Sequence, residues 1–446
     1  MENSTTFLNT VPFSDLINWS FQYLGDNEFS YNEDYKLVTL GSFLTRNKTV
    51  VDIQDDIVYK RVTVSAQNRG IKLRDSLLGK KIGTKKQFIV SENQFLLSKI
   101  DARNGAFGIV PSAVDGAIIT GNFWTYDVDY SMINPTFLSL IVTTPEFIEF
   151  CERASNGTTN RHYLQEDLFL TQQIPLPTLV EQNRIIANYN SKLNLAVKQE
   201  EKAIQLEEEI KIYLYNSLGI KKLVKKENIT GLQFTKFSML NRWDGKLSHN
   251  LESNFPIVKI KNILKTISTG TTPPTARKEY FENGKITFYT PADLTNKMYL
   301  TESDRKVTQL AIENKKARKF LKNTLLFVGI GSTVGKVGII KNEYATSNQQ
   351  ITGLNFDESK VEVEFTYFYF NYFQHITTKE RTRATIPIVN QSKILQIPFP
   401  LPPLNIQREI VARVTKLNNE IKKVYDSAKR NKMDAIKEFE QEIFSK

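Results

Sequence analysis

The stretch FVGIGSTVGKVGI, residues 327–339, contains glycine and lysine residues that could cradle a phosphate group. A phosphate-binding loop requires Gly, four residues, and then Gly-Lys-Ser/Thr. Gly335 and Lys336 supply the central pair, but Ile330 stands at the position of the first glycine and Val337 at that of the magnesium-binding hydroxyl. The spacing argues against a nucleotide site and favours a tight glycine turn between two apolar strands. These strands are expected at Thr324–Ile330 and Lys336–Ile340.

Three other patterns contain the residue types of a catalytic centre. Asn134–Phe137 is one proline short of the turn used by methyltransferases of exocyclic amines, and we interpret it as a helix start with proline at the first position. Glu358–Lys360 has the Glu-x-Lys form of some nucleases but is typical of a solvated charge run. Cys151 and His162 have no local signature of a nucleophile pair. The sequence therefore predicts no catalytic centre and no metal site in this chain.

The bulk composition is that of a globular protein of 446 residues, long enough for two or three domains. One cysteine excludes an intrachain disulfide and favours a reducing compartment. No leader and no membrane-spanning run is evident, so we expect a cytoplasmic protein. The 59 Lys and Arg residues exceed the 48 Asp and Glu residues, and the net charge of +11 is compatible with a polyanionic partner such as DNA.

The chain contains an internal repeat of long period, because three short segments recur about 225 to 230 positions later. The first pair shares Phe, Ser, Leu and Trp, the second aligns glycines, and the third shares Pro, Leu, Pro, Leu, Gln and Ile. The pairs are Phe13–Trp19 with Phe237–Trp243, Leu96–Val110 with Leu326–Ile340, and Pro175–Ile185 with Pro400–Ile410. The glycine stretch is therefore one of two equivalent turns, and a nucleotide pocket would not need a copy without the lysine.

Each repeat is expected to form a mixed α/β domain followed by a long helix. The short apolar runs favour strands at Leu37–Leu40, Phe88–Val90, Gly116–Thr120, Ile286–Tyr289 and Gln349–Asn355, with helical patches at Pro135–Arg153 and Phe365–Ile376. The fold class is therefore α/β (α+β), in two tandem domains. We place the boundaries at 1–177 (first domain), 178–220 (first helix), 221–403 (second domain) and 404–446 (second helix).

The two long helices are expected to pair as an antiparallel coiled coil, because apolar residues recur at steps of three and four. The seam of the first helix is interrupted by Glu200 and Glu207 but also includes Tyr189, Leu214 and Leu218, and Asn431 is the polar position of the second helix. Separate helices lying on their own domains would leave the matched lengths unexplained. The predicted seam residues are Ile186, Leu193, Val197, Ile204, Ile410, Val414, Leu417, Ile421, Val424 and Ala428.

The aromatic segment Phe365–Phe373 has two interpretations. It could stack nucleic-acid bases, or it could be a helix that packs its rings into a domain core. We favour the core, because stacking platforms usually lie on open sheets.

The two domains and their exit helices resemble the specificity subunit of type I restriction-modification enzymes. The resemblance covers nearly the whole chain and is most specific at Ile397–Val411 and its copy from Ile174. Ile267–Pro273 and Phe288–Leu294 also resemble the start of a recognition domain of that family, a motif that the first domain lacks.

The resemblance implies that each domain reads one half of a split DNA sequence and that the paired helices dock two modification subunits. S-adenosylmethionine, ATP and magnesium would be bound by the modification and restriction subunits, and this chain would have no cofactor of its own. A stand-alone methyltransferase or nuclease, and an adaptor that binds only proteins, are the alternatives. Turnover without a partner would favour the first of them, and a lack of salt-sensitive DNA binding would favour the second.

Candidate DNA contacts are polar side chains near the two glycine turns, since base edges require paired donors and acceptors. Lysine and arginine runs at Lys80-Lys81, Lys85-Lys86, Lys315-Lys316 and Arg318-Lys319 could meet phosphates. In the first domain the candidates are Lys99, Asp101, Arg103, Asn104, Asn122, Asn160 and Arg161. In the second they are Thr269, Thr271, Thr272, Ser332, Thr333, Lys336, Asn348, Gln349, Arg381 and Arg383.

Overall fold

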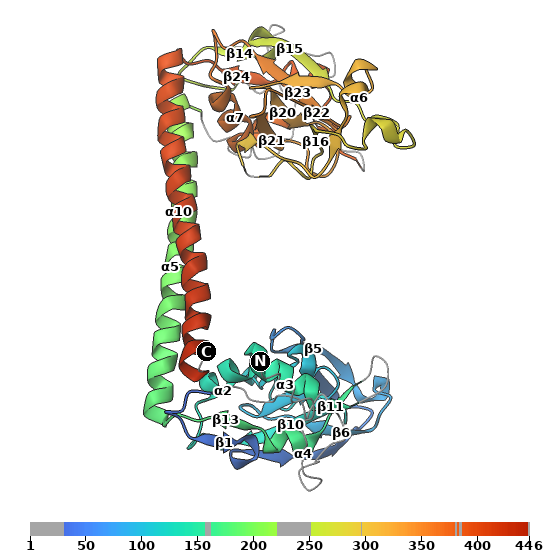
Figure 1. The fold of residues 1–446 in the computed structure, drawn as a ribbon, viewed down its shortest axis with the longest axis vertical. Helices are drawn as coiled ribbons and strands as arrows, with labels where there is room; N and C mark the ends of the chain where they lie inside the picture. The colour runs from blue at the N-terminus through green and yellow to red at the C-terminus, as the bar shows by residue number, and fades with distance from the viewer. Residues whose placement is uncertain are drawn as a thin grey trace, which may run out of the picture. The chain divides into compact units, whose positions relative to one another are not determined.

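The chain forms two compact units in a computed structural model, which describes residues 31–156, 162–220, 251–295, 297–379, 381–382 and 386–444. One unit comprises Met1–Gln199 with Ser427–Lys446, and the other comprises Glu200–Asp426. Each unit contains one mixed α/β domain and part of both long helices (Figure 1). The repeated segments Phe13–Trp19 and Phe237–Trp243 lie outside the described residues.

The described residues of the first domain form two larger sheets and three short α-helices. Its antiparallel four-stranded sheet has the order β2 (Leu44–Asn47), β10 (Phe123–Val128), β7 (Phe95–Ser98), β8 (Phe107–Ile109). Its five-stranded sheet has the order β3 (Val50–Asp52), β6 (Lys86–Ile89), β9 (Ile118–Ile119), β4 (Val58–Val64), β5 (Ile71–Leu78). A further pair joins β11 (Ser155–Asn156) to β12 (Tyr163–Leu164), and the helices are α2 (Pro135–Val142), α3 (Pro145–Arg153) and α4 (Glu166–Thr171).

The second domain repeats this plan with one parallel edge in its main sheet. That sheet has the order β15 (Leu264–Thr269), β23 (Ile351–Phe356), β20 (Leu325–Val328), β21 (Val337–Ile340), β17 (Tyr299–Leu300). The second sheet has the order β18 (Lys306–Val307), β16 (Ile286–Tyr289), β22 (Tyr344–Ser347), β19 (Lys319–Leu321). Its helices are α6 (Gln309–Glu313), α7 (Val363–Tyr372), α8 (Gln374–Thr377) and α9 (Gln391–Ile394).

The two glycine turns are equivalent, as the repeat predicts. Each connects antiparallel neighbours, β7 with β8 in the first domain and β20 with β21 in the second. Gly105 has φ 74° and Gly335 has φ 99°, a conformation that other residues rarely adopt. Residues 327–339 therefore belong to a strand–turn–strand unit, as predicted.

In each domain, a two-stranded antiparallel pair joins the segment that begins the domain to the segment that leads into the long helix. β1 (Leu37–Thr39) pairs antiparallel with β13 (Gln173–Pro175), and β14 (Ile257–Lys259) pairs antiparallel with β24 (Pro398–Pro400). A buried residue follows the first strand of each pair: Leu40 N–H donates to Gln172 O and Ile260 N–H to Ile397 O. The chain therefore enters and leaves each domain at neighbouring positions.

The predicted helical patch Pro135–Arg153 is two helices, not one. α2 begins at Pro135, and the side chain of its N-cap residue Asn134 accepts a hydrogen bond from Thr136 N–H, which confirms the interpretation of Asn134–Phe137 as a helix start. The patch breaks because Pro145 cannot continue a helix, and Thr144 caps the new one. Cys151 on α3 lies in the apolar core of the domain.

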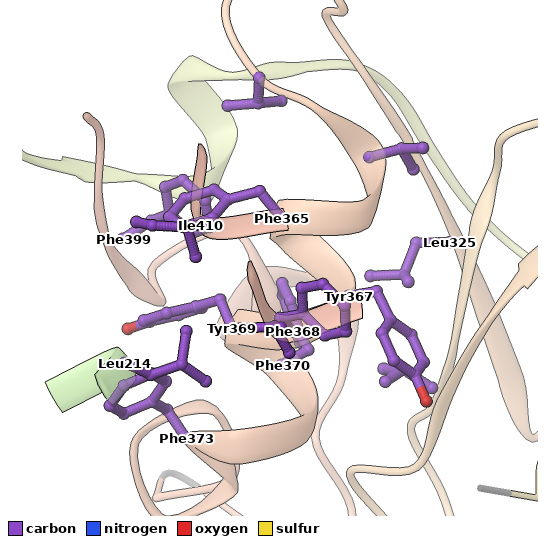
Figure 2. Packing of buried hydrophobic residues seen from close by; sticks show 14 of the residues in the cluster. Leu214, Leu325, Phe365, Tyr367, Phe368, Tyr369, Phe370, Phe373, Phe399 and Ile410 are labelled. Carbon is purple, nitrogen blue, oxygen red and sulfur yellow. The ribbon is translucent and has the colours of Figure 1, made fainter. Parts of the chain in front are cut away.

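The aromatic segment is a core helix, as predicted. Phe365, Tyr367, Phe368, Tyr369 and Phe370 of α7 are all buried, and Figure 2 shows their rings interleaved with residues of β20, β24 and both long helices. Phe365 and Tyr369 meet the Phe399 ring edge-on, at centroid distances of 5.6 and 4.9 Å. These rings are therefore not available for stacking on bases.

The two long helices, α5 (Leu179–Leu218) and α10 (Leu404–Ile443), pair antiparallel in each unit (Figure 1). In the first unit, Lys192 forms an ion pair with Glu438 and Arg184 with Glu442. In the second, Lys202 lies 3.1 Å from Glu420, and Arg413 lies 2.7 Å from Glu209. The partner's number falls as the α5 number rises, which confirms the predicted antiparallel pairing.

The seam of α10 is buried largely as predicted. Ile410, Val414, Leu417, Ile421 and Ala428 are buried, and Val424 is half-buried. Asn431, the polar position, donates from Nδ2 to Gln199 Oε1 at 2.8 Å. Gln199 also donates to the Ser427 hydroxyl at 3.0 Å, so a polar network crosses the helix pair.

The predicted seam of α5 is wrong at two positions. Ile186 is buried and Leu193 is half-buried, but Val197 and Ile204 are 47% and 59% exposed. The buried stripe passes instead through Ala196, Ala203, Leu206 and Ile210, and it ends at Leu214 and Leu218, which are buried as predicted. The prediction followed the large residues Val197 and Ile204, whereas the buried positions are the small alanines one residue before each of them.

None of the described helices is long and apolar enough to cross a membrane.

Candidate nucleic-acid interface

A hollow of about 340 Å³ lies in the second domain, at the end of the main sheet where β15 and β20 end and β23 begins. The end of β15, the Asn348–Gln350 loop before β23, the Gly329–Ile330 segment after β20 and the start of α9 meet there. Gly270 permits this approach, because a Cβ on it would lie 2.3 Å from Asn348 O. The Thr-Gly-Thr-Thr-Pro motif therefore places its threonines against the loop before β23.

Amide side chains line this hollow and hold each other in place. Gln391 Nε2 donates to Thr269 Oγ1 at 2.7 Å, and Asn348 Nδ2 donates to Gln350 Oε1 at 2.9 Å. The Thr272 hydroxyl donates to Gln349 Oε1. Each of the three glutamine side chains is thereby oriented while it keeps part of its hydrogen-bonding capacity. We call Gln349, Gln350, Asn390 and Gln391 the amide patch.

The first domain builds the same frame with different side chains. Lys99 N–H donates to Asn122 O at 3.0 Å, and Gly329 N–H donates to Gln350 O at 2.8 Å. Leu164 N–H donates to Lys99 O, and Val389 N–H donates to Gly329 O, both at 2.8 Å. Lys99 therefore corresponds to Gly329, and Asn122 to Gln350, so the backbone of the interface is duplicated while its chemistry differs.

The corresponding surface of the first domain is cationic and aromatic. Lys99 Nζ lies 5.5 Å from the centroid of the Tyr163 ring. Arg46 on β2 lies over the rings of Trp124 and Tyr126 and forms a 2.9 Å ion pair with Glu166. Burial lowers the pKa of the Arg46 guanidinium, and Tyr126 and the Glu166 carboxylate partly counteract this effect. The ion pair and both rings fix the guanidinium beside β10.

The structure brings some of the predicted candidates together and separates others. Lys99, Asp101, Asn104 and Asn122 gather around the first glycine turn, where Asp101 N–H donates to Ser98 Oγ at 3.2 Å. Arg103 belongs to the same short helix as Asn104. Thr269, Thr272, Asn348 and Gln349 gather around the hollow, and Thr271 lies in the motif loop with a buried hydroxyl.

Other candidates lie on the second glycine turn, beside the end of α8. A Cβ on Gly335 would lie 2.6 Å from Thr378 Cγ2, and Arg381 N–H donates to Thr378 O at 3.0 Å. Ser332, Thr333 and Lys336 belong to this turn, and Ser332 is exposed. Asn160, Arg161 and Arg383 lie outside the described residues.

The basic residues proposed for phosphates are all exposed. Lys85 pairs with Asp55 at 2.5 Å, and Lys319 Nζ lies 4.1 Å from the centroid of the Tyr344 ring. The set is Lys80, Lys81, Lys85, Lys86, Lys315, Lys316, Arg318 and Lys319.

Four residues at these surfaces were not predicted from the sequence: Gln350, Asn390 and Gln391 in the second domain and Tyr163 in the first. The sequence did contain a signal, because both Gln349-Gln350 and Asn390-Gln391 are pairs of adjacent amide side chains in the last third of the second domain. Their meeting depends on the antiparallel bridge between Ile330 and Ile388, which short-range patterns do not contain.

Two features bear on catalysis. Burial raises the pKa of the Cys151 thiol, so the thiol stays protonated in the core. Among the described residues, no group of three His, Cys, Asp or Glu side chains could hold a metal ion.

Comparison with known proteins gives one match to a family model and several to solved structures. Residues 252–427 match the model of the type I restriction modification DNA specificity domain. A structure reporting complex assembly and conformational transition of the type I R-M system contains a chain of 17% identity and TM-score 0.62, covering 93% of this chain and 97% of that one.

Two further chains have lower structural similarity. They are the HsdS subunit from Thermoanaerobacter tengcongensis (14% identity, TM-score 0.48, coverage 92% and 95%) and the type I restriction-modification S subunit from M. genitalium (13%, 0.43, 93% and 98%). The family match falls on the second domain and its helix, and the first half of the chain repeats their architecture. Residues 252–427 therefore belong to the family of type I restriction modification DNA specificity domains, and the whole chain shares the fold of the matched chain from a type I R-M system.

Proposed function

We propose that each of the two domains reads one half of a bipartite DNA site and that the chain catalyses no step itself. The observation that carries this proposal is the duplicated interface frame, in which Lys99 and Asn122 stand where Gly329 and Gln350 stand in the second domain. One frame with two sets of polar side chains suits two different base sequences. Base edges are distinguished by such donors and acceptors, whereas contacts to phosphates are independent of sequence.

The net charge of +11 favours the approach of DNA and gives binding that weakens as salt rises. The exposed lysines described above can supply phosphate contacts, while the amide patch and the Lys99 surface supply sequence readout. S-adenosylmethionine, ATP and magnesium are assigned to partner subunits.

The proposal is tested by co-expression with a modification subunit and mapping of methylated adenines. We expect one bipartite sequence with a fixed spacer. Methylation by the purified chain alone, with S-adenosylmethionine and no partner, would contradict the non-catalytic role.

We further propose that modification subunits dock on the exposed apolar residues of the paired helices. Val197 and Ile204 are seven residues apart on α5 and so lie on one face of it. Ile204, Ile212 and Tyr425 are exposed in the second unit, and Leu195, Met433 and Ile436 are exposed in the first. A contiguous exposed apolar patch marks a protein-binding surface, and we place this patch on the face of α5 that carries Val197 and Ile204.

Replacing Ile204 by Asp should weaken binding of the modification subunit by about tenfold or more, because a charge would be buried at an apolar contact. Stability should change by less than about 0.5 kcal/mol, since Ile204 is 59% exposed. Titration of labelled modification subunit measures the effect, and thermal unfolding measures the stability. Gln205→Asp, at an exposed polar neighbour, is the matched control. Equal loss in both variants would place the docking surface elsewhere.

A further inference from the structure

Two glutamines occupy equivalent buried positions at the beginnings of the long helices. Gln182 of α5 and Gln407 of α10 are both 0% exposed. Each lies in the first turn and bonds through its own N–H to the residue four positions earlier, Thr178 or Pro403. Fully buried polar side chains are uncommon and cost stability unless all of their groups are paired.

The Gln182 side chain ties α5 to two separate segments of the first domain. Its Nε2 donates to Met132 O at 3.0 Å and to Pro177 O at 2.8 Å. Its Oε1 accepts from Asn134 N–H at 2.7 Å. Asn134 is the N-cap residue of α2, so the amide joins the start of one helix to the start of another.

Gln407 makes the same three hydrogen bonds in the second domain. Its Nε2 donates to Lys360 O at 3.0 Å and to Pro402 O at 2.8 Å, and its Oε1 accepts from Glu362 N–H at 2.9 Å. Glu362 is the N-cap residue of α7. Both protons of each carboxamide are therefore used, and its oxygen is used as well.

The residue after each glutamine reinforces the connection. Asn134 Nδ2 donates to Asn183 Oδ1 at 2.9 Å in the first domain. Arg408 Nε donates to Glu362 Oε1 at 2.7 Å in the second. We call each glutamine, together with its three main-chain partners, a glutamine clamp.

The clamp supplies what apolar packing cannot. Ile185 and Ile186 in the first unit, and Ile410 and Val414 in the second, pack the helices against the domain cores. Apolar contact is non-directional, so it tolerates small rotations of the helix. Hydrogen bonds weaken steeply when their angle departs from linear. Each glutamine side chain makes three hydrogen bonds to two segments of its domain, and together these bonds fix the rotation and tilt of the domain on its helix.

We propose that Gln182 and Gln407 are positioning residues that set the orientation of each recognition domain on its own helix, and thereby the spacer length that the subunit accepts. The spacer part rests on the proposed reading of bipartite DNA. An angular change at the base of a domain moves its reading edge, whereas the base contacts of that domain stay the same.

The test uses Gln182→Met and Gln407→Met in the full-length chain bound to its modification subunit. Methionine has similar length and no hydrogen-bonding amide, so it keeps the packing and removes the clamp. Gln205→Met on α5 and Gln441→Met on α10, both at exposed positions, are the matched controls.

The first measurement is hydrogen exchange of the Asn134 and Glu362 amides. We expect about tenfold or more faster exchange at Asn134 in Gln182→Met, at Glu362 in Gln407→Met, and at neither in the controls. Unchanged exchange at these amides would overturn the clamp itself.

The second measurement compares methylation rates on duplexes with the natural spacer and with one base pair more or fewer. We expect the preference for the natural spacer to fall by about tenfold, equal to about 1.4 kcal/mol, while the preferred bases of both half-sites stay the same. A variant that loses rate equally on all spacers would show a purely structural role and overturn the positioning role.

The two measurements separate the inference from the proposed function. If the wild-type complex methylated all spacers alike, the reading of bipartite DNA would fail, and spacer selection by the clamp would fail with it. The exchange measurement would still decide whether the glutamines hold the domains on their helices.

Discussion

Exchanging residues 256–402 for the same segment of a specificity subunit with another target should replace one half of the methylated sequence and leave the other half unchanged. The expected change is complete, because base discrimination of about 1–3 kcal/mol per good contact accumulates over several base pairs. Mapping of methylated adenines after co-expression with the modification subunit measures it.

The architecture of the second domain supports this expectation. The segment begins beside β14 and ends beside β24, and these strands pair antiparallel from Ile257 with Pro400 to Lys259 with Pro398. The exchanged piece therefore begins and ends at one place, and the helices that hold it are untouched. An unchanged methylated sequence would refute the assignment of half-site recognition to this domain. A complex that no longer assembles would be detected by co-purification, and a donor segment with the same backbone course at positions 360, 362 and 402 would preserve the glutamine clamp.

Replacing Gln350 and Gln391 by Ala should reduce methylation of the natural site by about 10- to 100-fold, since one bidentate amide–base contact is worth about 1–3 kcal/mol. The loss should be specific to one half-site and should fall on an A·T pair. Glutamine presents a donor and an acceptor side by side, which match N7 and the N6 amino group of adenine. Among the described residues that line the hollow around the amide patch, none is a lysine or arginine of the kind that reads guanine.

The measurement compares the variant with wild type on duplexes that carry each single base-pair substitution in both half-sites. The variant should stop discriminating at one position and keep its preferences at the others. Gln309→Ala, at an exposed position on α6 of the same domain, is the control. A uniform loss on all sequences, with a lower slope of binding against salt, would mean that these glutamines contact phosphates instead.

Much of the architecture could be predicted from the sequence because it is carried by local patterns. Glycine at the two turns, proline before the long helices and the repeated Pro-Leu-Pro segment each specify a backbone geometry. The α10 seam was also evident, since Val414, Leu417 and Ile421 are large and regularly spaced. The α5 seam was not, because its central members Ala196 and Ala203 carry little hydrophobicity although both are fully buried.

The interface could be predicted only in part, because its pieces are distant in the sequence. Thr269 and Gln391 are joined by a side-chain hydrogen bond across 122 positions. The glycine turns indicated the correct end of the sheet, and Asn348 and Gln349 were predicted because they lie near that end. Gln350 and Gln391 became visible only when the pairing of β15 with β23 and the bridge from Ile330 to Ile388 were known.

The burial of Cys151 has a practical consequence for measuring distances in solution. It is the one thiol of the chain, and it lies in the core of the first domain. A maleimide dye should therefore leave it unmodified under native conditions. Cysteines introduced at exposed positions, one on each recognition domain, could then carry a fluorescent donor and acceptor without removal of the natural residue. Energy transfer between the dyes would report how far apart the two reading edges stand with and without DNA.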